Sequence, residues 1–247
     1  MAAKRILKCL ENIYKFIIDV LFPRRCPFCD QVLTFGNSRI CGICRNEIMY
    51  AGDVTCRRCG RPLYDATAEF CNDCKKYEHI FDRGVSLLVY NDISRGAIFR
   101  FKYRNRQEYS DFFASETAKK LGREIKAFNA DAIIAVPLHK DKLRQRGFNQ
   151  SELLAKKIAE LLNINFISDY MLRIRKTAPQ KNLNRDERRK NLKKSFKIRQ
   201  NDVKLKKIIV IDDIYTTGST IDEIAYVLKK AGVSKVYFVT IATGSAM

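Results

Sequence analysis

Two adjacent carboxylates, followed by hydroxyl side chains and a glycine, are the residues of this chain best suited to chemistry. Asp212 and Asp213 directly follow a short apolar run at residues 208–211, which is typical of a buried parallel strand. A helical pattern then opens on small residues: Thr216, Thr217, Gly218, Ser219 and Thr220. Unpaired N–H groups at a helix start bind phosphate, and paired acids accept hydrogen bonds from vicinal hydroxyls. The sequence therefore predicts a ribose-phosphate pocket, with an ordinary capped helix and two turn acids as the alternative.

A second strand end carries cations. Residues 132–136 form another buried-strand pattern, which leads into a basic loop and then into a helix. The loop contains Pro137, Leu138, His139, Lys140, Arg144 and Arg146. Its cationic and N–H donors can hold a diphosphate opposite the first phosphate cradle. A solvated helix start is the ordinary alternative for the arginines, and a loop histidine near phosphates is more often a donor or a bystander than a base.

Eight of the nine cysteines fall into four Cys-x-x-Cys pairs: Cys26/Cys29, Cys41/Cys44, Cys56/Cys59 and Cys71/Cys74. The same spacing of 11 residues separates the first two pairs and the last two, which predicts two structural Zn²⁺ sites of four thiolates each. We favour sequential sites, because each repeat then closes locally, and a cross-braced pairing stays open. Disulfides are a weaker alternative because no secretory signal is recognisable. Redox catalysis is also weaker, since four motifs exceed the needs of one exchange site.

The chain is strongly basic, with 47 Lys and Arg residues against 27 Asp and Glu and a formal net charge of +20. One basic stretch interleaved with aromatic residues contains Arg100, Lys102, Tyr103, Arg104 and Arg106. Cations that meet phosphates and rings that stack on bases are typical of single-strand binding, so we expect single-stranded DNA as a partner. Three ordinary explanations remain open: an anionic small ligand accounts for the charge, a Lys-rich proteome raises it without any nucleic-acid role, or the rings are core residues of a helix.

These motifs require three parts of the chain. Residues 1–24 show an amphipathic helical stripe, which we expect to pack on the body of the protein, with peripheral membrane contact as the alternative. The stripe is too short and too charged to span a bilayer. Residues 25–78 are expected to form a double zinc ribbon, and residues 79–247 an α/β domain with a parallel sheet flanked by helices.

The order hydrophobic-DD-x-x-TTGST resembles the PRPP-binding signature of type I phosphoribosyltransferases. This resemblance implies their fold. It also implies that Asp212 and Asp213 bind the ribose 2′ and 3′ hydroxyls at the catalytic centre, that residues 216–220 bind the 5′-phosphate, and that Mg²⁺ bridges the diphosphate and the ribose. By the same resemblance the basic loop is the diphosphate loop, and a mobile flap contains Arg173, Arg175, Thr177, Gln180, Arg188 and Asn191.

The patterns VPLHxxxLRxRGFNQ and LRxRxTxxQxxLxxxxRxxN resemble the ComF family, competence-associated proteins with a phosphoribosyltransferase domain. Membership implies a cytoplasmic protein that acts in DNA uptake. It would handle incoming single-stranded DNA at the inner face of the cytoplasmic membrane during natural transformation, with a competence helicase as a further candidate partner. The alternative is an active PRPP-dependent phosphoribosyltransferase or amidophosphoribosyltransferase of nucleotide metabolism or salvage, with no DNA role.

Overall fold

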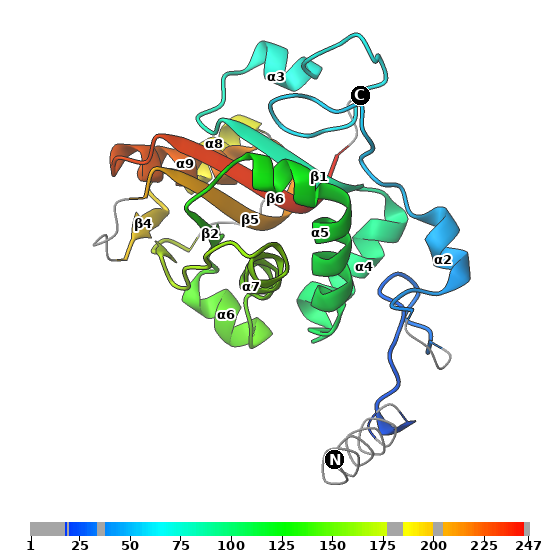
Figure 1. The fold of residues 1–247 in the computed structure, drawn as a ribbon. Coiled ribbons are helices and arrows are strands. Elements are labelled where there is room, and N and C mark those ends of the chain that lie inside the picture. Colours follow the sequence, from blue (N-terminus) through cyan, green and yellow to red (C-terminus); the bar gives the residue numbers. More distant parts are fainter. Residues whose placement is uncertain (1–17, 19, 34–37, 177–184, 200–204, 245–247) are drawn as a thin grey trace, which may run out of the picture. The chain divides into compact units, whose positions relative to one another are not determined.

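The computed structural model describes residues 18, 20–33, 38–176, 185–199 and 205–244 (Figure 1). The chain divides into two compact units, Met1–Ile48 and Met49–Met247. The first unit contains α2 (Gly42–Glu47) and the first two cysteine pairs. The other two pairs, with α3 (Asn72–Lys76), belong to the same unit as the sheet. Most of the helix predicted over residues 1–24 lies outside the described residues.

A four-stranded parallel sheet forms the centre of the second unit, in the order β1-β6-β5-β2. The strands are β1 (Arg83–Val89), β2 (Ala132–Ala135), β5 (Lys207–Tyr215) and β6 (Lys235–Thr243). Their apolar runs suit strands that are covered on both faces. One face packs against α9 (Ser219–Lys230), and the other against α5 (Tyr109–Ala127) and α7 (Gln150–Leu162) (Figure 1). The predicted α/β fold with a parallel sheet is confirmed.

Strand β5 runs further than its apolar segment. We expected a strand over residues 208–211 with the two acids at its end, but β5 continues through them to Tyr215. The reason is its partner: β6 keeps pairing with β5, so that Asp212 lies opposite Thr240 and Tyr215 opposite Thr243. The other neighbour, β2, stops at the pair formed by Ala135 and Ile211. The acids therefore stand on a two-stranded edge, open on the side where β2 has ended.

The remaining elements surround this edge. Helix α4 (Asp92–Tyr103) follows β1, and α6 (Lys140–Arg146) follows β2. An antiparallel pair of short strands, β3 (Met171–Arg173) and β4 (Phe196–Ile198), flanks α8 (Arg185–Leu192), which packs against α9. None of the described helices combines the length and hydropathy that a bilayer-spanning segment requires.

Candidate functional site

The two acids on β5 are held by side chains of α4 and α7. The Asp213 carboxylate accepts hydrogen bonds from Gln150 Nε2 at 2.7 Å and from Lys102 Nζ at 2.8 Å. Asp212 Oδ1 accepts from Ser151 Oγ at 3.2 Å and from the Asp213 N–H at 2.9 Å. The pair is thus fixed in orientation, and Asp213 is additionally neutralised by an ammonium group.

Burial and the neighbouring Asp213 charge raise the pKa of Asp212 to about 7. The Asp213 N–H, the Lys102 ammonium and the Ser151 hydroxyl oppose this rise but do not cancel it. Two adjacent carboxylates in one partly buried place resist ionising together. A cation or hydroxyl donors placed between them would favour the fully charged pair.

Gly218 shapes the turn between β5 and α9. It caps α9 with a left-handed backbone, at φ 78°. A Cβ at this position would lie 2.9 Å from His79 Cε1 and 2.9 Å from Tyr215 Oη. Both the backbone conformation and the tight packing therefore require glycine here.

The predicted phosphate cradle, residues 216–220, is a turn rich in hydroxyl groups. Thr217 Oγ1 and Ser219 Oγ lie 2.9 Å apart, within hydrogen-bond distance. A small hollow in this turn is lined by Thr216, Gly218, Ser219 and Thr220 together with Asp212. The hollow opens at the start of α9, where backbone N–H groups and the helix dipole favour an anion. The turn thus has the composition and the position of a phosphate site beside the acids.

The basic segment after β2 is a helix, α6, where we expected a loop. His139 caps it: its Nδ1 accepts a hydrogen bond from the Asp141 N–H at 3.3 Å. A left-handed glycine, Gly147, ends the helix at φ 78°. Cap and stop both lie in the sequence, but the seven residues between them are too few to reveal a helical period. His139 is buried and serves as the cap, and neither it nor Pro137 lines the cleft described below.

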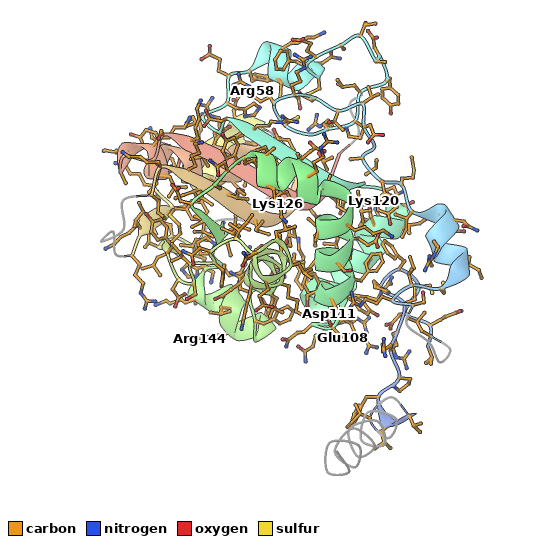
Figure 2. All side chains as sticks on the ribbon, in the orientation of Figure 1. Arg58, Glu108, Asp111, Lys120, Lys126 and Arg144 are labelled. Atoms are coloured by element: carbon orange, nitrogen blue, oxygen red, sulfur yellow. The ribbon has the colours of Figure 1, made fainter. Side chains whose placement is uncertain are left out.

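The helical form of α6 decides which of its cations meet the acids. Residues four apart share one face of a helix, so Lys142 and Arg146 lie together and line the cleft. Lys140 and Arg144 lie on another face and are exposed, and Figure 2 shows Arg144 at the outer edge of α6. Of the cations predicted for the diphosphate, only Arg146 lines the cleft, and Lys142 joins it.

Arg146 is connected to the acid pair through Gln150. Its Nη1 donates to Gln150 Oε1 at 2.9 Å, and the amide nitrogen of the same Gln150 donates to Asp213. Its Nη2 donates to the Tyr103 hydroxyl at 2.9 Å. The end of α6 and the start of α7 therefore form one hydrogen-bonded network with the acids.

Two residues of the predicted flap also reach the cleft. Arg173, at the end of β3, lines it, and burial lowers the pKa of its guanidinium. Arg188, on α8, donates from Nη1 to Thr216 Oγ1 at 2.9 Å. Arg175 is exposed and donates to the Lys193 carbonyl. Asn191 does not line the cleft, and Thr177 and Gln180 lie outside the described residues.

These side chains border one cleft with a volume of about 550 Å³. Its cations outnumber its two acids, Asp212 and Asp213, and are Arg95, Lys102, Lys142, Arg146, Arg173 and Arg188. Leu138, Val136, Ile214, Tyr90 and Tyr103 complete much of its wall. A volume of several hundred Å³ suits a small ligand, and the surplus of cations suits one with several phosphates.

The stretch predicted to bind nucleic acid does not form one surface. Successive residues of a helix point about 100° apart, so Arg100, Phe101 and Lys102 point to different sides of α4. Arg104 and Arg106 follow the end of this helix. Lys102 binds Asp213 and, with Tyr103, lines the cleft. Phe101 is fully buried, as the core alternative predicts. Arg104 is exposed, Arg100 is partly buried, and Arg106 lies 3.6 Å from the Glu108 carboxylate.

The paired cysteines gather into two groups of four, one in each repeat, and within each group the sulfur atoms lie within 4.8 Å of one another. Cys29 Sγ and Cys41 Sγ are 3.8 Å apart, and Cys59 Sγ and Cys71 Sγ 3.7 Å. Four sulfurs at about 2.3 Å from a tetrahedral Zn²⁺ would be about 3.8 Å apart. The eight cysteines form no disulfide. The grouping is the sequential one, and both donor sets fit structural zinc.

Sequence reasoning missed three residues that line the cleft beside the acids: Lys142, Gln150 and Ser151. A signal for Gln150 was present, because it closes the RGFNQ pattern and stands four residues after Arg146. Lys142 is also four residues from Arg146, but this spacing places the two side chains together only if the segment is a helix, which the sequence did not reveal. Nothing local marks Ser151, since its contact with Asp212 joins residues 61 positions apart.

Comparison with known proteins finds two family models on this chain. A double zinc ribbon domain matches residues 17–75, and a phosphoribosyl transferase domain matches residues 149–246. The two matches together cover both cysteine groups, the acid pair and the phosphate turn. They agree with the order of modules predicted from the motifs.

Characterised relatives match most of the chain. Competence protein F of Haemophilus influenzae is 30% identical over 225 residues, which cover 87% of this chain and 95% of that protein. DNA utilization protein YhgH of Escherichia coli O157:H7 is 30% identical over 221 residues, which cover 87% of this chain and 94% of that protein. Competence protein ComFC of Bacillus subtilis is 25% identical over 79% of this chain and 80% of its own. Shared modules and relatives of matching length together show that this chain belongs to the ComF family.

Proposed function

We propose that the cleft binds PRPP together with Mg²⁺. Asp212 and Asp213 would accept hydrogen bonds from the ribose 2′ and 3′ hydroxyls and offer the oxygen ligands that Mg²⁺ prefers. Residues 216–220 would hold the 5′-phosphate through N–H and hydroxyl donors. Lys142 and Arg146 would face the diphosphate, and bound Mg²⁺ would share the neutralisation of that group.

The main support is that the acid pair and the phosphate turn follow each other on one strand end, across the cleft from the cations of α6. A pentose carrying phosphate at one end and diphosphate at the other needs this order of donors. The phosphoribosyl transferase domain match covers the acids and the turn and supports the same ligand. The surplus of cations over acids in the cleft is also consistent with an anion of high charge.

Calorimetric titration of the zinc-loaded protein with PRPP and Mg²⁺ tests this proposal. The double variant Asp212→Asn and Asp213→Asn should lose at least about a hundredfold in affinity, because amides neither bind Mg²⁺ well nor accept as strongly from hydroxyls. Asp169→Asn is the matched control, since Asp169 is an exposed acid outside the cleft. Unchanged affinity in the double variant would refute the assignment of the ribose site.

We also propose that the protein acts in DNA uptake and handles single-stranded DNA in the cytoplasm, at the inner face of the membrane. Two observations support this role. Relatives that match over most of the chain are named for competence and for DNA utilization. The net charge of +20 favours a polyanionic partner. Fluorescence anisotropy with a labelled oligonucleotide would test it, and absence of binding at low salt would count against a direct DNA role.

Catalysis is the second candidate function for the same cleft. The acid pair, the phosphate turn and the opposing cations are all present, which favours an active PRPP-dependent transferase. In such a reaction a nucleophile displaces diphosphate at the anomeric carbon, and positioning with charge stabilisation lowers the barrier. Release of diphosphate from PRPP with a panel of bases and ammonia would support turnover. PRPP binding without release would favour a binding role.

A further inference from the structure

The second cysteine group lies inside the core of the unit that carries the cleft. Cys56, Cys59 and Cys71 share one buried cluster with Phe81 and Tyr215, the residue that precedes the phosphate turn. A Cβ on Gly60, the residue after Cys59, would lie 2.6 Å from the Gly84 carbonyl oxygen of β1. This ribbon repeat therefore packs directly on the sheet.

Arg61 joins the second cysteine group to the phosphate turn. Its side chain is only 11% exposed. Nη1 donates to the Asp73 carboxylate at 2.8 Å, and Asp73 stands between Cys71 and Cys74. Nη2 donates to the Thr216 carbonyl at 2.6 Å. The Arg61 guanidinium thus links the Cys71–Cys74 segment of the second cysteine group to Thr216, the first residue of the phosphate turn.

The first ribbon repeat offers an internal comparison for the position of Arg61. The two repeats share their backbone at an offset of 30 residues. The Cys26 N–H donates to the Gln31 carbonyl at 2.9 Å, and the Cys56 N–H donates to the Arg61 carbonyl at 2.7 Å. An isolated antiparallel β-bridge pairs Arg25 with Val32 in the first repeat, and the equivalent β-bridge pairs Thr55 with Pro62 in the second. Residues 25–32 of the first repeat are therefore the structural counterparts of residues 55–62 of the second.

The side chains at these counterparts differ where the second repeat meets the turn. Gln31 stands at the position of Arg61, and Ile43, 71% exposed, stands at the position of Asp73. Asp30, at φ 63°, occupies the position of Gly60. The zinc-ribbon backbone thus needs neither the arginine nor the aspartate. Their presence in the second repeat has to be explained by what they contact.

A second contact from the same side holds the turn. The buried His79 side chain lies against Gly218, and its Nδ1 is 2.8 Å from Asp222 Oδ2 in the first turn of α9. The Ile80 N–H donates to Asp222 Oδ1 at 2.7 Å. His79 and Ile80 follow directly after the second repeat. The turn is therefore held at both ends by this part of the chain, through Arg61 at Thr216 and through His79 at Gly218 and Asp222.

We propose that Arg61 is a positioning residue through which the second cysteine group, when it holds zinc, sets the shape of the phosphate turn. The first group has no such role. Loss of metal from the second group would displace Asp73, release Arg61 from the Thr216 carbonyl and weaken phosphate binding. The effect on ligand affinity rests on the proposed PRPP site, whereas the effect on the turn itself does not.

Arg61→Gln tests the bridge, because glutamine stands at the equivalent position of the first repeat and suits the ribbon backbone. Arg57→Gln is the matched control: it makes the same change in the same repeat, at a residue whose side chain is 67% exposed. Both variants should keep two zinc ions per chain. Only Arg61→Gln should speed amide hydrogen exchange at residues 217–220, and PRPP affinity should fall about tenfold, as expected when a charge-assisted hydrogen bond is lost.

Further variants keep the outcomes distinguishable. Asp73→Ile, which copies Ile43, should reproduce the exchange pattern of Arg61→Gln. Cys59→Ser and Cys29→Ser should each release one zinc, but only Cys59→Ser should speed exchange in the turn. Equal exchange in Arg61→Gln and the parent protein would overturn the proposal. If the parent binds no PRPP while the exchange difference is present, the proposed ligand fails and the positioning role stands.

Discussion

At the level of single residues, the acid pair is poised between two charge states. Asp213 is engaged by Lys102 and Gln150, whereas Asp212 has one hydroxyl and one N–H donor. Burial and the neighbouring Asp213 charge outweigh these two donors and raise the pKa of Asp212. A ligand that brings Mg²⁺ and two hydroxyls would supply the donors that Asp212 lacks.

Ligand affinity should therefore depend on pH through Asp212. With a pKa raised to about 7, this carboxyl is mostly neutral at pH 6 and mostly charged at pH 8. Binding of Mg²⁺ needs the charged form, so PRPP affinity should rise about tenfold between these pH values. Calorimetry at both pH values measures the change. The phosphates of PRPP titrate as well, so the comparison is with Asp212→Asn, whose pH dependence should lack this factor; an identical profile would contradict the assignment.

Lys102 sets where that titration occurs. Its ammonium lowers the pKa of Asp212 and pairs with the buried Asp213. Lys102→Met should therefore move the pH midpoint of PRPP binding upward. It should also destabilise the fold by about 3 kcal/mol, since the buried Asp213 carboxylate would keep the neutral Gln150 donor but lose its counter-charge. Thermal melts and the pH profile measure both effects. Lys126→Met, at an exposed lysine of α5 (Figure 2), should change neither.

At the level of elements, the sequence located the strand ends but not the faces of the short helices. Buried apolar runs marked the carboxyl ends of β2 and β5, and ligand groups were expected there. Helix α6 has only seven residues, too few for a hydrophobic period to appear. Lys140 and Arg144 were therefore assigned to the site, and Lys142 was not. Within residues 100–106, α4 turns Arg100, Phe101 and Lys102 to different sides, and the helix ends at Tyr103.

Lys140 and Lys142 of α6 offer a direct test of which face of this helix meets the ligand. Lys142 lines the cleft, and burial followed by repulsion from Arg173 lowers the pKa of its amine. An anion beside it would raise this pKa again. Lys142→Ala should reduce the affinity for PRPP or free diphosphate by at least about tenfold, as loss of one charged contact predicts. Lys140 lies two residues earlier on α6 and is exposed, so Lys140→Ala should change the affinity less than twofold. Equal losses of affinity in the two variants would show that Lys140 also contacts the ligand, as the sequence predicts.

At the level of the whole molecule, the spacing of the cysteines predicts the two zinc-ribbon repeats, but it does not predict that the second repeat packs on the sheet. Equal intervals predicted two similar ribbons, and the structure groups the sulfurs in that way. Only the second repeat lies in the unit of the sheet, and the contacts responsible are long-range. The Gly84 N–H of β1 donates to the Arg58 carbonyl at 2.8 Å, and Arg61 donates to a residue 155 positions away. Such contacts leave no local pattern, except that Gly60, Arg61 and Asp73 depart from their counterparts in the first repeat.

The net charge of the chain makes a prediction that separates its two proposed ligands. PRPP would be bound by a few fixed groups inside one cleft, whereas a DNA strand would meet cations spread over the surface. If single-stranded DNA neutralises at least three cations, raising salt from about 50 to 200 mM should weaken it about twentyfold or more, because counterions are released from the strand. PRPP held by Mg²⁺ and buried donors should lose less. Anisotropy and calorimetry over the same salt series measure both. Saturating PRPP should leave a surface-bound oligonucleotide in place, and complete displacement would instead show that the strand occupies the cleft.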